Sequence, residues 1–412
     1  AETDEALYEI VNPEIVSAEG GEVAIEGCLS IPGLVGEVER ASSVTVTGLD
    51  RDGKSIWVDG DEFLSRVLQH EIDHLDGVLF VDKSSRLYES EPEPDKFPPK
   101  RFRVVFMGTP EIAVPCLISI LRDGHEIAAV VTQPDRRKGR GLEFRPSPVK
   151  EAATRHRLPV VQPDSCKSPE FIGWMRRMRP DVVVVVAFGR VLPREVLEIP
   201  EYGCINVHAS LLPRYRGAAP INRAVMNGET VTGVTTMYLS ERLDAGDVIL
   251  QRQVPVSPGD DAGSLEEKLK VEGAELLVQT LRLIGSGSAP RIPQDESRAT
   301  YAPMLTLKDE VIDWNRTPEE VSNQVRGMSP RPGAHTVRGG SKIKVFRCTP
   351  VTGVSPGGSP GEVLRADERS GLIVAVSGGA VRIEEVQAEG GKRMPITDFL
   401  RGARIRPGEI LG

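Results

Sequence analysis

Two groups of polar residues in this sequence have types and spacing that suit catalysis. In the first group, Asn206 and His208 stand two apart at the end of the apolar run 204–208. Residues two apart on a strand point to the same face, so an amide donor and a titratable imidazole would lie side by side. Asp244, in the segment Leu-Asp-Ala-Gly-Asp at 243–247, adds a carboxylate in a turn. The alternative interpretations are a hydrogen-bonded core histidine and a simple Asx turn.

The second group combines Cys28 with His70, Glu71 and His74. Four residues apart on a helix, His70 and His74 would lie on one face and could bind one metal ion. Glu71 lies beside them, where its carboxylate could take a proton from a metal-bound water. Cys28 lies in Glu-Gly-Cys-Leu-Ser at 26–30, where a glycine bend could present a thiolate as the third ligand. The alternatives are two partly exposed helix histidines and a small, buried, apolar cysteine.

The parts of the chain that must position these groups differ in composition. Residues 1–100 contain 23 acidic and 8 basic residues, whereas the remainder has 37 acidic and 43 basic residues. Only the second part therefore has a net charge that attracts a polyanion. No apolar run reaches the roughly 18 residues of a membrane span, and the five cysteines are scattered, which argues against a disulfide framework. We expect a cytoplasmic protein whose partners include neither a membrane nor DNA.

The pattern of apolar residues predicts several domains. Short alternating runs lead into one helix from about Asp61, with Phe63 and Leu75 among its apolar positions, which indicates a small α+β domain. A proline-rich, apolar-poor segment at 82–100 is typical of a linker.

After the linker, continuous apolar strands alternate with helical segments, which is the α/β doubly wound pattern. Ser147 and Ser264 are predicted to cap two of these helices. From about Leu307, strand-like runs between glycine and proline turns predict a small β-barrel, although a sandwich would look similar. The predicted domains are 1–85, 101–306 and 307–412, with a linker at 86–100.

Residues 103–412 resemble methionyl-tRNA formyltransferases over essentially their full length. The matching motifs are FMGTP (106–110), QPDRRKGRG (133–141), VVVAFG (184–189), INVHASLLPRYRGAAPI (205–221) and GVTTMYLSERLDAGD (233–247). The resemblance implies a Rossmann-like catalytic domain, 10-formyltetrahydrofolate as co-substrate and methionyl-initiator tRNA as acceptor. It also implies catalytic roles for Asn206, His208 and Asp244. The residues that it places against the folate are Ser210, Leu211, Leu212 and Pro213.

Formyl transfer asks for these residue types. The α-amine of the acceptor attacks the formyl carbon carried on N10 of the folate, and the tetrahedral intermediate develops an oxyanion. The Asn206 amide and a protonated His208 are suitable donors to that oxyanion. Asp244 would raise the proton affinity of the imidazole and help to pass a proton to the leaving N10.

The catalytic residues alone do not identify the acceptor, because transformylases of small amines such as glycinamide ribonucleotide and amino sugars share them. Two features favour tRNA. Arg136, Arg137, Lys138 and Arg140 form a basic, glycine-containing loop that can follow phosphates, although a solvated charged loop is the alternative. In the resembled family the matching loop enters the acceptor-stem region. The C-terminal domain, which small-amine enzymes generally lack, resembles that family's tRNA-binding barrel.

Residues 7–84 resemble the C-terminal part of peptide deformylases, through EGCLS (26–30) and QHEIDHLDG (69–77). The resemblance implies that Cys28, His70 and His74 hold Fe²⁺ (or Zn²⁺, Ni²⁺ or Co²⁺) and that Glu71 is the general acid/base. That family's first motif, Gly-x-Gly-x-Ala-Ala-x-Gln, has no match in residues 1–27. We therefore expect this truncated segment to be inactive as given. The alternatives are a fragment of a bifunctional peptide deformylase/methionyl-tRNA formyltransferase, and an RNA-binding or scaffold module built from decayed enzyme domains.

Overall fold

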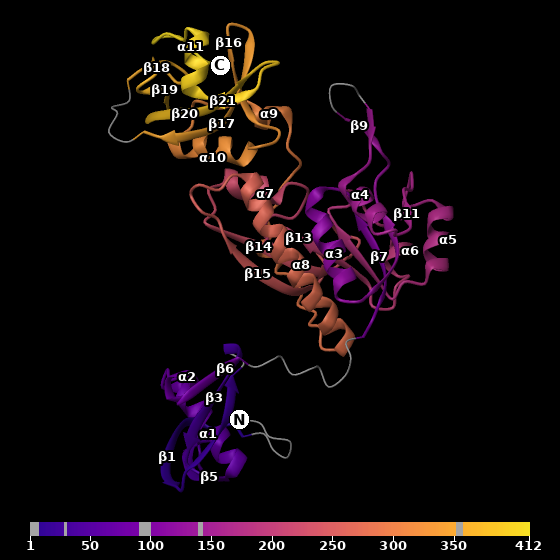
Figure 1. Ribbon diagram of the computed structural model, residues 1–412, viewed down its shortest axis with the longest axis vertical. Coiled ribbons are helices and arrows are strands. Elements are labelled where there is room, and N and C mark those ends of the chain that lie inside the picture. Colours follow the sequence, from indigo (N-terminus) through magenta and orange to yellow (C-terminus); the bar gives the residue numbers. More distant parts are fainter. Residues whose placement is uncertain (1–7, 29–30, 90–99, 139–142, 352–356) are drawn as a thin grey trace. The chain divides into compact units, whose positions relative to one another are not determined.

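The structure is a computed structural model that describes residues 8–28, 31–89, 100–138, 143–351 and 357–412. The chain forms two compact units, the N-terminal unit (Ala1–Pro98) and the main unit (Pro99–Gly412) (Figure 1). The boundary between them falls within the segment that the sequence predicts as a linker. Among the described residues, no helix is both long enough and apolar enough to span a bilayer.

The N-terminal unit contains two three-stranded antiparallel sheets and one long helix. Its elements are β1 (Val11–Glu19), β2 (Glu22–Cys28), β3 (Ile31–Arg40), β4 (Ser43–Leu49), β5 (Ser55–Asp61), α1 (Glu62–Leu75), α2 (Phe80–Lys83) and β6 (Arg86–Glu89). The sheet orders are β1-β4-β5 and β2-β3-β6. Because side chains alternate along a strand, the sequence Ser-Val-Thr-Val-Thr of β4 turns Val44 and Val46 into the core.

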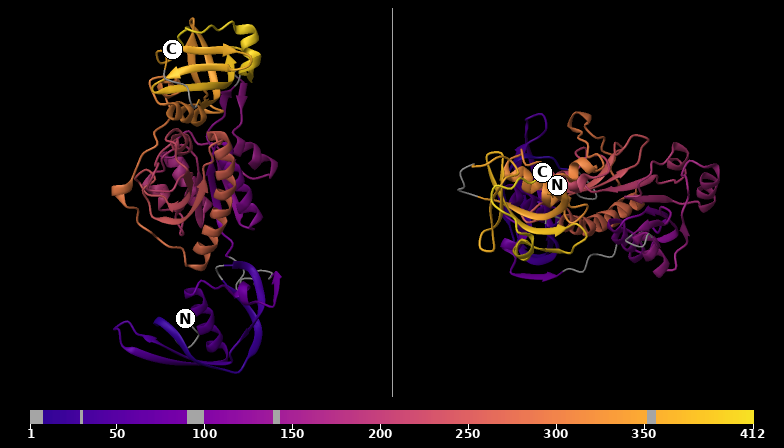
Figure 2. Two further views of the ribbon diagram at one scale, coloured as in Figure 1. Left: turned by 90° about the vertical axis from the view of Figure 1, so that its left-hand side faces the viewer. Right: turned by 90° about the horizontal axis from the view of Figure 1, so that it is seen from above.

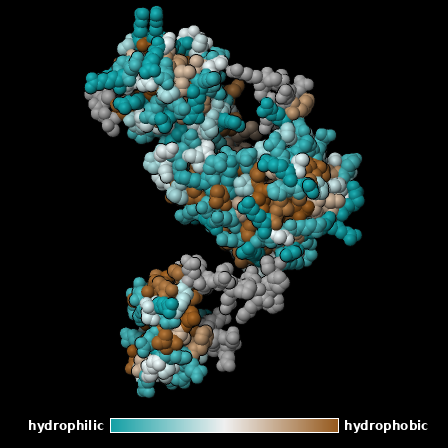
Figure 3. All heavy atoms as spheres, in the orientation of Figure 1, coloured by the Kyte–Doolittle hydropathy of each residue, from teal (hydrophilic) through white to brown (hydrophobic). Residues whose placement is uncertain are grey.

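The apolar core of the N-terminal unit is small. One cluster of fully buried side chains consists of Val44, Val46 and Leu68. Phe63 and Leu75 of α1 are 68% and 69% exposed, although both belong to its apolar periodicity. Figure 3 shows apolar side chains gathered on the visible face of this unit. A helix normally buries its apolar stripe, so part of that stripe on α1 has no partner among the residues described for this unit.

A seven-stranded sheet forms the centre of the main unit, in the order β11-β8-β7-β12-β13-β14-β15. Its strands are β7 (Arg103–Gly108), β8 (Glu126–Val131), β11 (Val160–Val161), β12 (Val182–Val186), β13 (Cys204–His208), β14 (Val231–Tyr238) and β15 (Val248–Pro255). The first five strands in this order run parallel, and β14 and β15 are antiparallel to their neighbours. The strand order reverses at β7, which lies between β8 and β12.

Helices cover both faces of this sheet. The helices of this part of the chain are η1 (Glu111–Ala113), α3 (Val114–Arg122), α4 (Pro148–Arg155), α5 (Pro169–Met178), α6 (Arg194–Leu197), α7 (Pro220–Met226), α8 (Ala262–Ser286) and η2 (Glu296–Arg298). Val182, Val184 and Val186 of β12 pack in one core with α3, α4 and α8. Val183 and Val185 pack in a second core with α5 and α6. An uninterrupted valine run is buried on both faces in this way, which confirms the predicted doubly wound arrangement.

Two helix starts test the sequence interpretation. Ser147 caps α4 as predicted, since its Oγ accepts a hydrogen bond from the Lys150 N–H at 3.1 Å. The prediction that Ser264 caps α8 is wrong by three residues, because Asp261 is the N-cap. Asp261 Oδ1 accepts from the Ser264 N–H at 2.8 Å, and Ser264 Oγ accepts from the Asp261 N–H at 3.1 Å. Ser264 is therefore the third residue of a reciprocal capping box.

The C-terminal part of the main unit is rich in β-structure (Figure 2). Its elements are α9 (Leu307–Glu310), α10 (Pro318–Met328), β16 (Ala334–Arg338), β17 (Ser341–Pro350), β18 (Val363–Asp367), β19 (Gly371–Val376), β20 (Gly379–Ala388), β21 (Arg393–Pro395) and α11 (Ile396–Ala403). The sheet has the order β16-β17-β20-β19-β18, and β21 pairs with β20. The last residues hydrogen-bond beside both edge strands: the Leu411 N–H to the Gly361 carbonyl, and the Gly412 N–H to the Val337 carbonyl. The predicted barrel stays a prediction.

The β-rich part packs on α7, the helix that follows the loop after β13. Asn222 Nδ2 donates to the Gly327 carbonyl of α10 at 2.8 Å. Arg223 forms two hydrogen bonds with the Asp309 carboxylate, at 2.7 and 3.0 Å. A Cβ atom at position 327 would lie 2.4 Å from Cγ of Met226, so this close helix contact requires glycine. The two parts of the main unit are thus tied to each other by polar and close-packed contacts.

Candidate active site and candidate metal site

Asn206 and His208 lie on β13, toward the carboxyl ends of the parallel strands. In register, Asn206 lies opposite Val185 of β12 and Met237 of β14, and His208 lies opposite Thr235. Both polar side chains are buried. Open α/β sheets bind ligands at the carboxyl ends of strands near the point where the strand order reverses. β13 is separated from that point by β12 alone, so the two side chains lie where this fold places a reaction site.

His208 and Asp244 are brought together by the loop that follows β13. His208 Nε2 lies 2.9 Å from the Tyr215 carbonyl, which can only accept a hydrogen bond, so Nε2 carries the proton. The other ring nitrogen, Nδ1, lies 3.7 Å from Asp244 Oδ2. Asp244 Oδ2 also accepts a hydrogen bond from the Gly217 N–H at 2.8 Å. A proton arriving on Nδ1 would therefore form an ion pair with a fixed carboxylate.

The loop after β13 is held by hydrogen bonds that reasoning from the sequence missed. Thr235 Oγ1 donates to the Ser210 carbonyl at 2.6 Å and accepts from the Leu212 N–H at 3.1 Å. Gln251 Nε2 donates to the Leu212 carbonyl at 2.8 Å. The signal for Thr235 is its register opposite the end of β13, which requires the pairing of β13 with β14 to be known.

The four residues predicted to contact folate differ in accessibility. Ser210 and Leu212 are buried, and Ser210 Oγ donates to the Arg214 carbonyl at 2.6 Å. Leu211 and Pro213 are partly exposed. Ser210 and Leu212 thus shape the loop from within, while Leu211 and Pro213 present side-chain surface. The contact with folate stays a prediction.

The basic segment predicted as a loop is in part a two-stranded ribbon. Arg136–Lys138 form β9, which pairs antiparallel with β10 (Glu143–Arg145), and Arg140 lies outside the described residues. Figure 1 shows β9 projecting away from the seven-stranded sheet. Lys150, which follows in sequence, is held within the protein by Asp135 at 2.7 Å and Gln162 at 2.8 Å. Arg136–Lys138 and Glu143–Arg145 thus have paired backbones, and the contact of the segment with tRNA stays a prediction.

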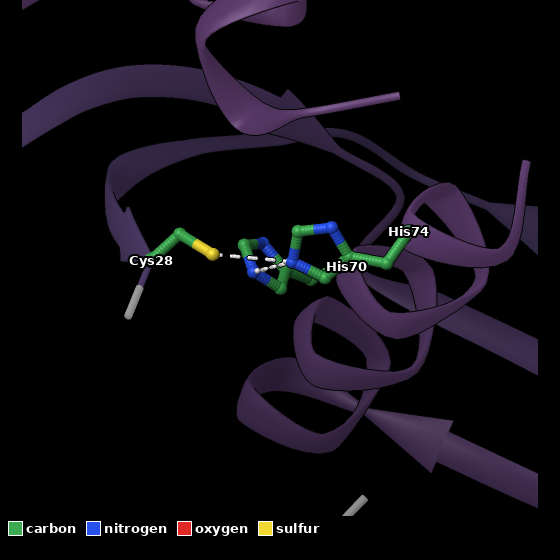
Figure 4. A group of neighbouring side chains, drawn as sticks. All are labelled: Cys28, His70 and His74. Carbon is green, nitrogen blue, oxygen red and sulfur yellow. Dashed lines mark hydrogen bonds between the residues drawn. The ribbon is translucent and has the colours of Figure 1, made fainter. Parts of the chain in front are cut away.

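Cys28, His70 and His74 converge in the N-terminal unit (Figure 4). Cys28 comes from the end of β2, and both histidines come from α1. Cys28 Sγ lies 3.1 Å from His74 Nε2, and the two histidine Nε2 atoms lie 3.1 Å apart. All three ligand atoms lie within 4.8 Å of one another. One thiolate and two imidazoles are a donor set for Fe²⁺, Zn²⁺, Ni²⁺ or Co²⁺, so the residues present fit a single transition-metal ion.

A buried carboxylate orients one of these histidines. His70 Nδ1 lies 3.2 Å from Glu26 Oε2, which leaves Nε2 directed at the other two ligands. Burial alone would raise the pKa of Glu26, but hydrogen bonds from Arg40, His70 and Arg66 hold that pKa below its ordinary value. Burial likewise lowers the pKa of His70, whereas Cys28 and Glu26 raise it, and the net direction is upward. Glu26 therefore stays anionic beside the ligand.

Arginines hold Glu26 in place. Arg40 donates to both carboxylate oxygens of Glu26, at 2.9 and 3.0 Å, and Arg66 donates to Oε1 at 2.7 Å. Arg40 also contacts Asp73, which pairs with Lys83. The sequence analysis quoted Glu26 within its motif without assigning it a role, and nothing in the spacing linked it to Arg40.

Glu71, the predicted general acid/base, lies outside this group of three ligands. Its side chain is exposed on α1, and it makes no hydrogen bond or ion pair with the residues that the structure describes. The catalytic role of Glu71 stays a prediction.

Comparisons with known proteins match both units. The family model described as "Formyl transferase" matches residues 100–281, "Formyl transferase, C-terminal domain" matches 304–404, and "Polypeptide deformylase" matches 1–90. A solved structure of HypX from Aquifex aeolicus with tetrahydrofolic acid shares the fold at 20% identity and a TM-score of 0.52, over 73% of this chain and 47% of HypX.

Curated relatives are closer in sequence. "Methionyl-tRNA formyltransferase" of Geobacter sulfurreducens is 49% identical over 310 residues, which are 75% of this chain and 96% of that protein. The protein of the same name from Moorella thermoacetica is 50% identical over 310 residues, 75% of this chain and 99% of its own length. An identity near one half over nearly the whole length of these relatives is sufficient to assign a family, and the chain belongs to the methionyl-tRNA formyltransferase family.

Proposed function

We propose that the main unit transfers the formyl group of 10-formyltetrahydrofolate to the α-amine of methionyl-tRNA. The observation that carries this proposal is the juxtaposition of Asn206, His208 and Asp244 at the carboxyl end of β13, in a chain about half identical to methionyl-tRNA formyltransferases. A formylated initiator methionine would then serve translation initiation.

The chemistry follows from the geometry of the three side chains. The acceptor amine forms a bond to the formyl carbon, and the carbonyl oxygen becomes an oxyanion. The Asn206 amide and the His208 ring donate hydrogen bonds to that oxyanion, and the Asp244 carboxylate, 3.7 Å from Nδ1, balances the positive charge that the ring gains when it accepts the proton in transit. When the bond from carbon to N10 breaks, N10 gains a proton and the attacking nitrogen loses one. Proton balance therefore requires no metal ion and no covalent enzyme intermediate.

The substrates are assigned by the same proposal. Leu211 and Pro213 are the partly exposed residues of the segment that we place against the folate, with Ser210 and Leu212 supporting them. The β9–β10 ribbon and the β-rich C-terminal part, taken as a barrel, would contact the tRNA.

The acceptor is tested directly. Purified chain with 10-formyltetrahydrofolate should formylate methionyl-tRNA, and glycinamide ribonucleotide is the control acceptor. Transfer to glycinamide ribonucleotide at an equal or higher kcat/KM would replace the tRNA assignment with a small-amine one.

Removal of the ribbon's positive charge should weaken tRNA binding. We expect a variant with Arg136, Arg137, Lys138 and Arg140 changed to alanine to bind methionyl-tRNA more weakly and with a flatter salt dependence, because each lost phosphate contact releases about one counterion fewer. Binding constants measured across a series of salt concentrations give the slope, and the affinity for folate should hardly change.

A charge-matched control separates this local effect from net charge. Arg122, Arg155, Lys167 and Arg177 are exposed residues of the same sheet domain, and changing them to alanine removes the same charge. An equal loss of slope in both variants would mean that tRNA does not recognise the ribbon.

The N-terminal unit receives a separate assignment. We propose that Cys28, His70 and His74 hold a metal ion, with Fe²⁺ first and Zn²⁺, Ni²⁺ or Co²⁺ as alternatives. Such an ion, when bound, supplies Lewis acidity toward a carbonyl oxygen or a water. The role of Glu26 is to fix the proton of His70 on Nδ1 and so to keep Nε2 free for the metal.

Glu26 gives a quantitative test of this metal site. Glu26→Gln should weaken metal affinity by about 10–100-fold, because the neutral amide no longer fixes and polarises His70. Metal titration with competing chelators measures the effect. Glu62→Gln, an exposed position at the start of the same helix, is the matched control. Equal metal affinities in the parent chain, Glu26→Gln and Glu62→Gln would show that Glu26 does not support a metal ligand.

A further inference from the structure

Arg216 is the largest of the fully buried side chains among the described residues, with 1% exposure. A buried guanidinium is costly unless its N–H groups find acceptors. Arg216 Nε and Nη2 donate to Gln294 Oε1 at 3.1 and 2.8 Å. Nη1 and Nη2 also donate to the two carboxylate oxygens of Glu296, each at 3.0 Å. The sequence analysis quoted Arg216 within a motif and gave it no role.

The Gln294 amide is oriented by Arg216. Because its oxygen faces the guanidinium, its NH₂ group faces the turn that carries Asp244. Gln294 Nε2 donates to the Asp244 carbonyl at 2.9 Å and to the Gly246 carbonyl at 2.8 Å. The next residue after Arg216, Gly217, donates its N–H to Asp244 Oδ2 at 2.8 Å. One dipeptide thus fixes both the main chain and the carboxylate of Asp244.

Asp244 needs such support. Its φ angle is +48°, a left-handed conformation that costs a non-glycine residue free energy and persists where surrounding contacts hold it. Gly246, two residues on, lies against the Tyr238 carbonyl so closely that a Cβ atom would be 1.8 Å from that oxygen. A side chain at position 246 would therefore collide with the Tyr238 carbonyl, and the two bonds from Gln294 hold the carbonyls of Asp244 and Gly246 in this tight turn.

We propose that Arg216 and Gln294 are positioning residues for formyl transfer. The Arg216 guanidinium orients the Gln294 amide, and that amide holds the Asp244 turn so that the carboxylate stays 3.7 Å from His208 Nδ1. The inference rests on the catalytic role proposed for Asp244. It adds that Arg216 and Gln294 act on the reaction only through this aspartate, without touching either substrate.

The test is a double-mutant cycle. Gln294→Leu keeps a similar volume and removes both donors, and we expect kcat to fall by about 10–100-fold, since small displacements of a catalytic group cost up to about 10²-fold. KM for methionyl-tRNA and for the formyl donor should stay within about twofold. In an Asp244→Asn background, Gln294→Leu should change kcat by less than about twofold, because the group that it positions is already lost.

A matched glutamine provides the control. Gln324 is buried, whereas Gln294 is partly exposed, and its Nε2 also bridges two backbone carbonyls, those of Asp309 at 3.0 Å and Val311 at 2.7 Å, in the β-rich part. We expect any effect of Gln324→Leu to be the same with and without Asp244→Asn. Arg216→Lys keeps the positive charge but loses the planar set of N–H donors that binds Gln294 and Glu296. It should therefore lower kcat, as Gln294→Leu does.

The outcomes distinguish this inference from the proposal beneath it. Independent, multiplicative effects of Gln294→Leu and Asp244→Asn would overturn the positioning role, and so would an unchanged kcat in Gln294→Leu. An unchanged kcat in Asp244→Asn alone would instead refute the catalytic assignment of the aspartate, and the positioning role would fall with it. If Gln294→Leu does not fold, Gln294→Glu replaces the donors while keeping an acceptor toward Arg216, and the same cycle applies.

Discussion

Replacing His208 by alanine or Asp244 by asparagine is expected to lower kcat for formyl transfer to methionyl-tRNA by about 10²–10⁴-fold, the range of general acid–base catalysis. Without the imidazole, the oxyanion loses a cationic donor and N10 loses its proton source. Without the carboxylate, the ring of His208 loses the anion that lies 3.7 Å from Nδ1 and balances a positive charge on the ring during proton transfer. Initial rates at saturating substrate concentrations measure both effects.

A buried histidine at the other end of the sheet supplies the control. His125 precedes β8, and its Nδ1 accepts a hydrogen bond from the Phe102 N–H at 3.1 Å. His125→Asn removes an equally buried ring from the same domain, and we expect kcat to stay near the parent value even if the free energy of unfolding falls. Near-normal turnover by His208→Ala or Asp244→Asn would remove these residues from the mechanism.

The doubly wound sheet was predictable from the sequence because its burial is two-sided. Val182–Val186 has no polar residue to mark a solvent face, and the structure places its alternate side chains in two cores. The same reasoning located Asn206 and His208, since a polar pair that ends such a run must lie at the carboxyl edge of a sheet. These inferences needed only local pattern and the general geometry of strands.

The approach of Asp244 to His208 was implied by resemblance and could not be derived from spacing. It depends on the Gly217 N–H, on the Gln294 bridge and on a left-handed backbone at Asp244 itself. Each of these joins segments that are far apart in sequence. The predicted start of α8 was wrong for a related reason. Asp261 and Ser264 can both cap a helix, and tertiary packing decides between them.

In the N-terminal unit, periodicity predicted α1 and the shared face of His70 and His74. It did not predict that Phe63 and Leu75 would be exposed, because a helical pattern shows which residues share a stripe and not what covers it. Glu26 was missed for the opposite reason. A single buried carboxylate has no periodic signal, and its role follows only from the arginines and the histidine that surround it.

We expect the chain as given to bind a metal ion but to catalyse peptide deformylation only slowly. Loaded anaerobically with Fe²⁺, the purified chain should bind one ion in the N-terminal unit, and Cys28→Ala or His74→Ala should abolish binding. Cys116→Ala is the matched cysteine control, because burial raises the pKa of that thiol to about 12 and keeps it from acting as a thiolate ligand. Metal content per chain, measured after gel filtration, distinguishes these variants.

Deformylation requires more than the metal ligands, since the formyl oxygen needs a donor and the catalytic carboxylate must reach the attacking water. Residues 1–27 lack the glycine-rich first motif of the resembled family, and Glu71 is exposed and makes no hydrogen bond or ion pair with the described residues. Loss of one oxyanion donor alone typically costs about 10²–10³-fold in rate.

We therefore expect the Fe²⁺-loaded chain to hydrolyse a formyl-Met tripeptide at least about 10²-fold more slowly than a whole deformylase assayed beside it. The same preparation should formylate methionyl-tRNA, which shows that the protein is folded and active. Deformylation at the rate of the whole enzyme, lost on Glu71→Gln, would establish the given chain as a bifunctional enzyme, because Glu71 would then reach the substrate despite its exposure.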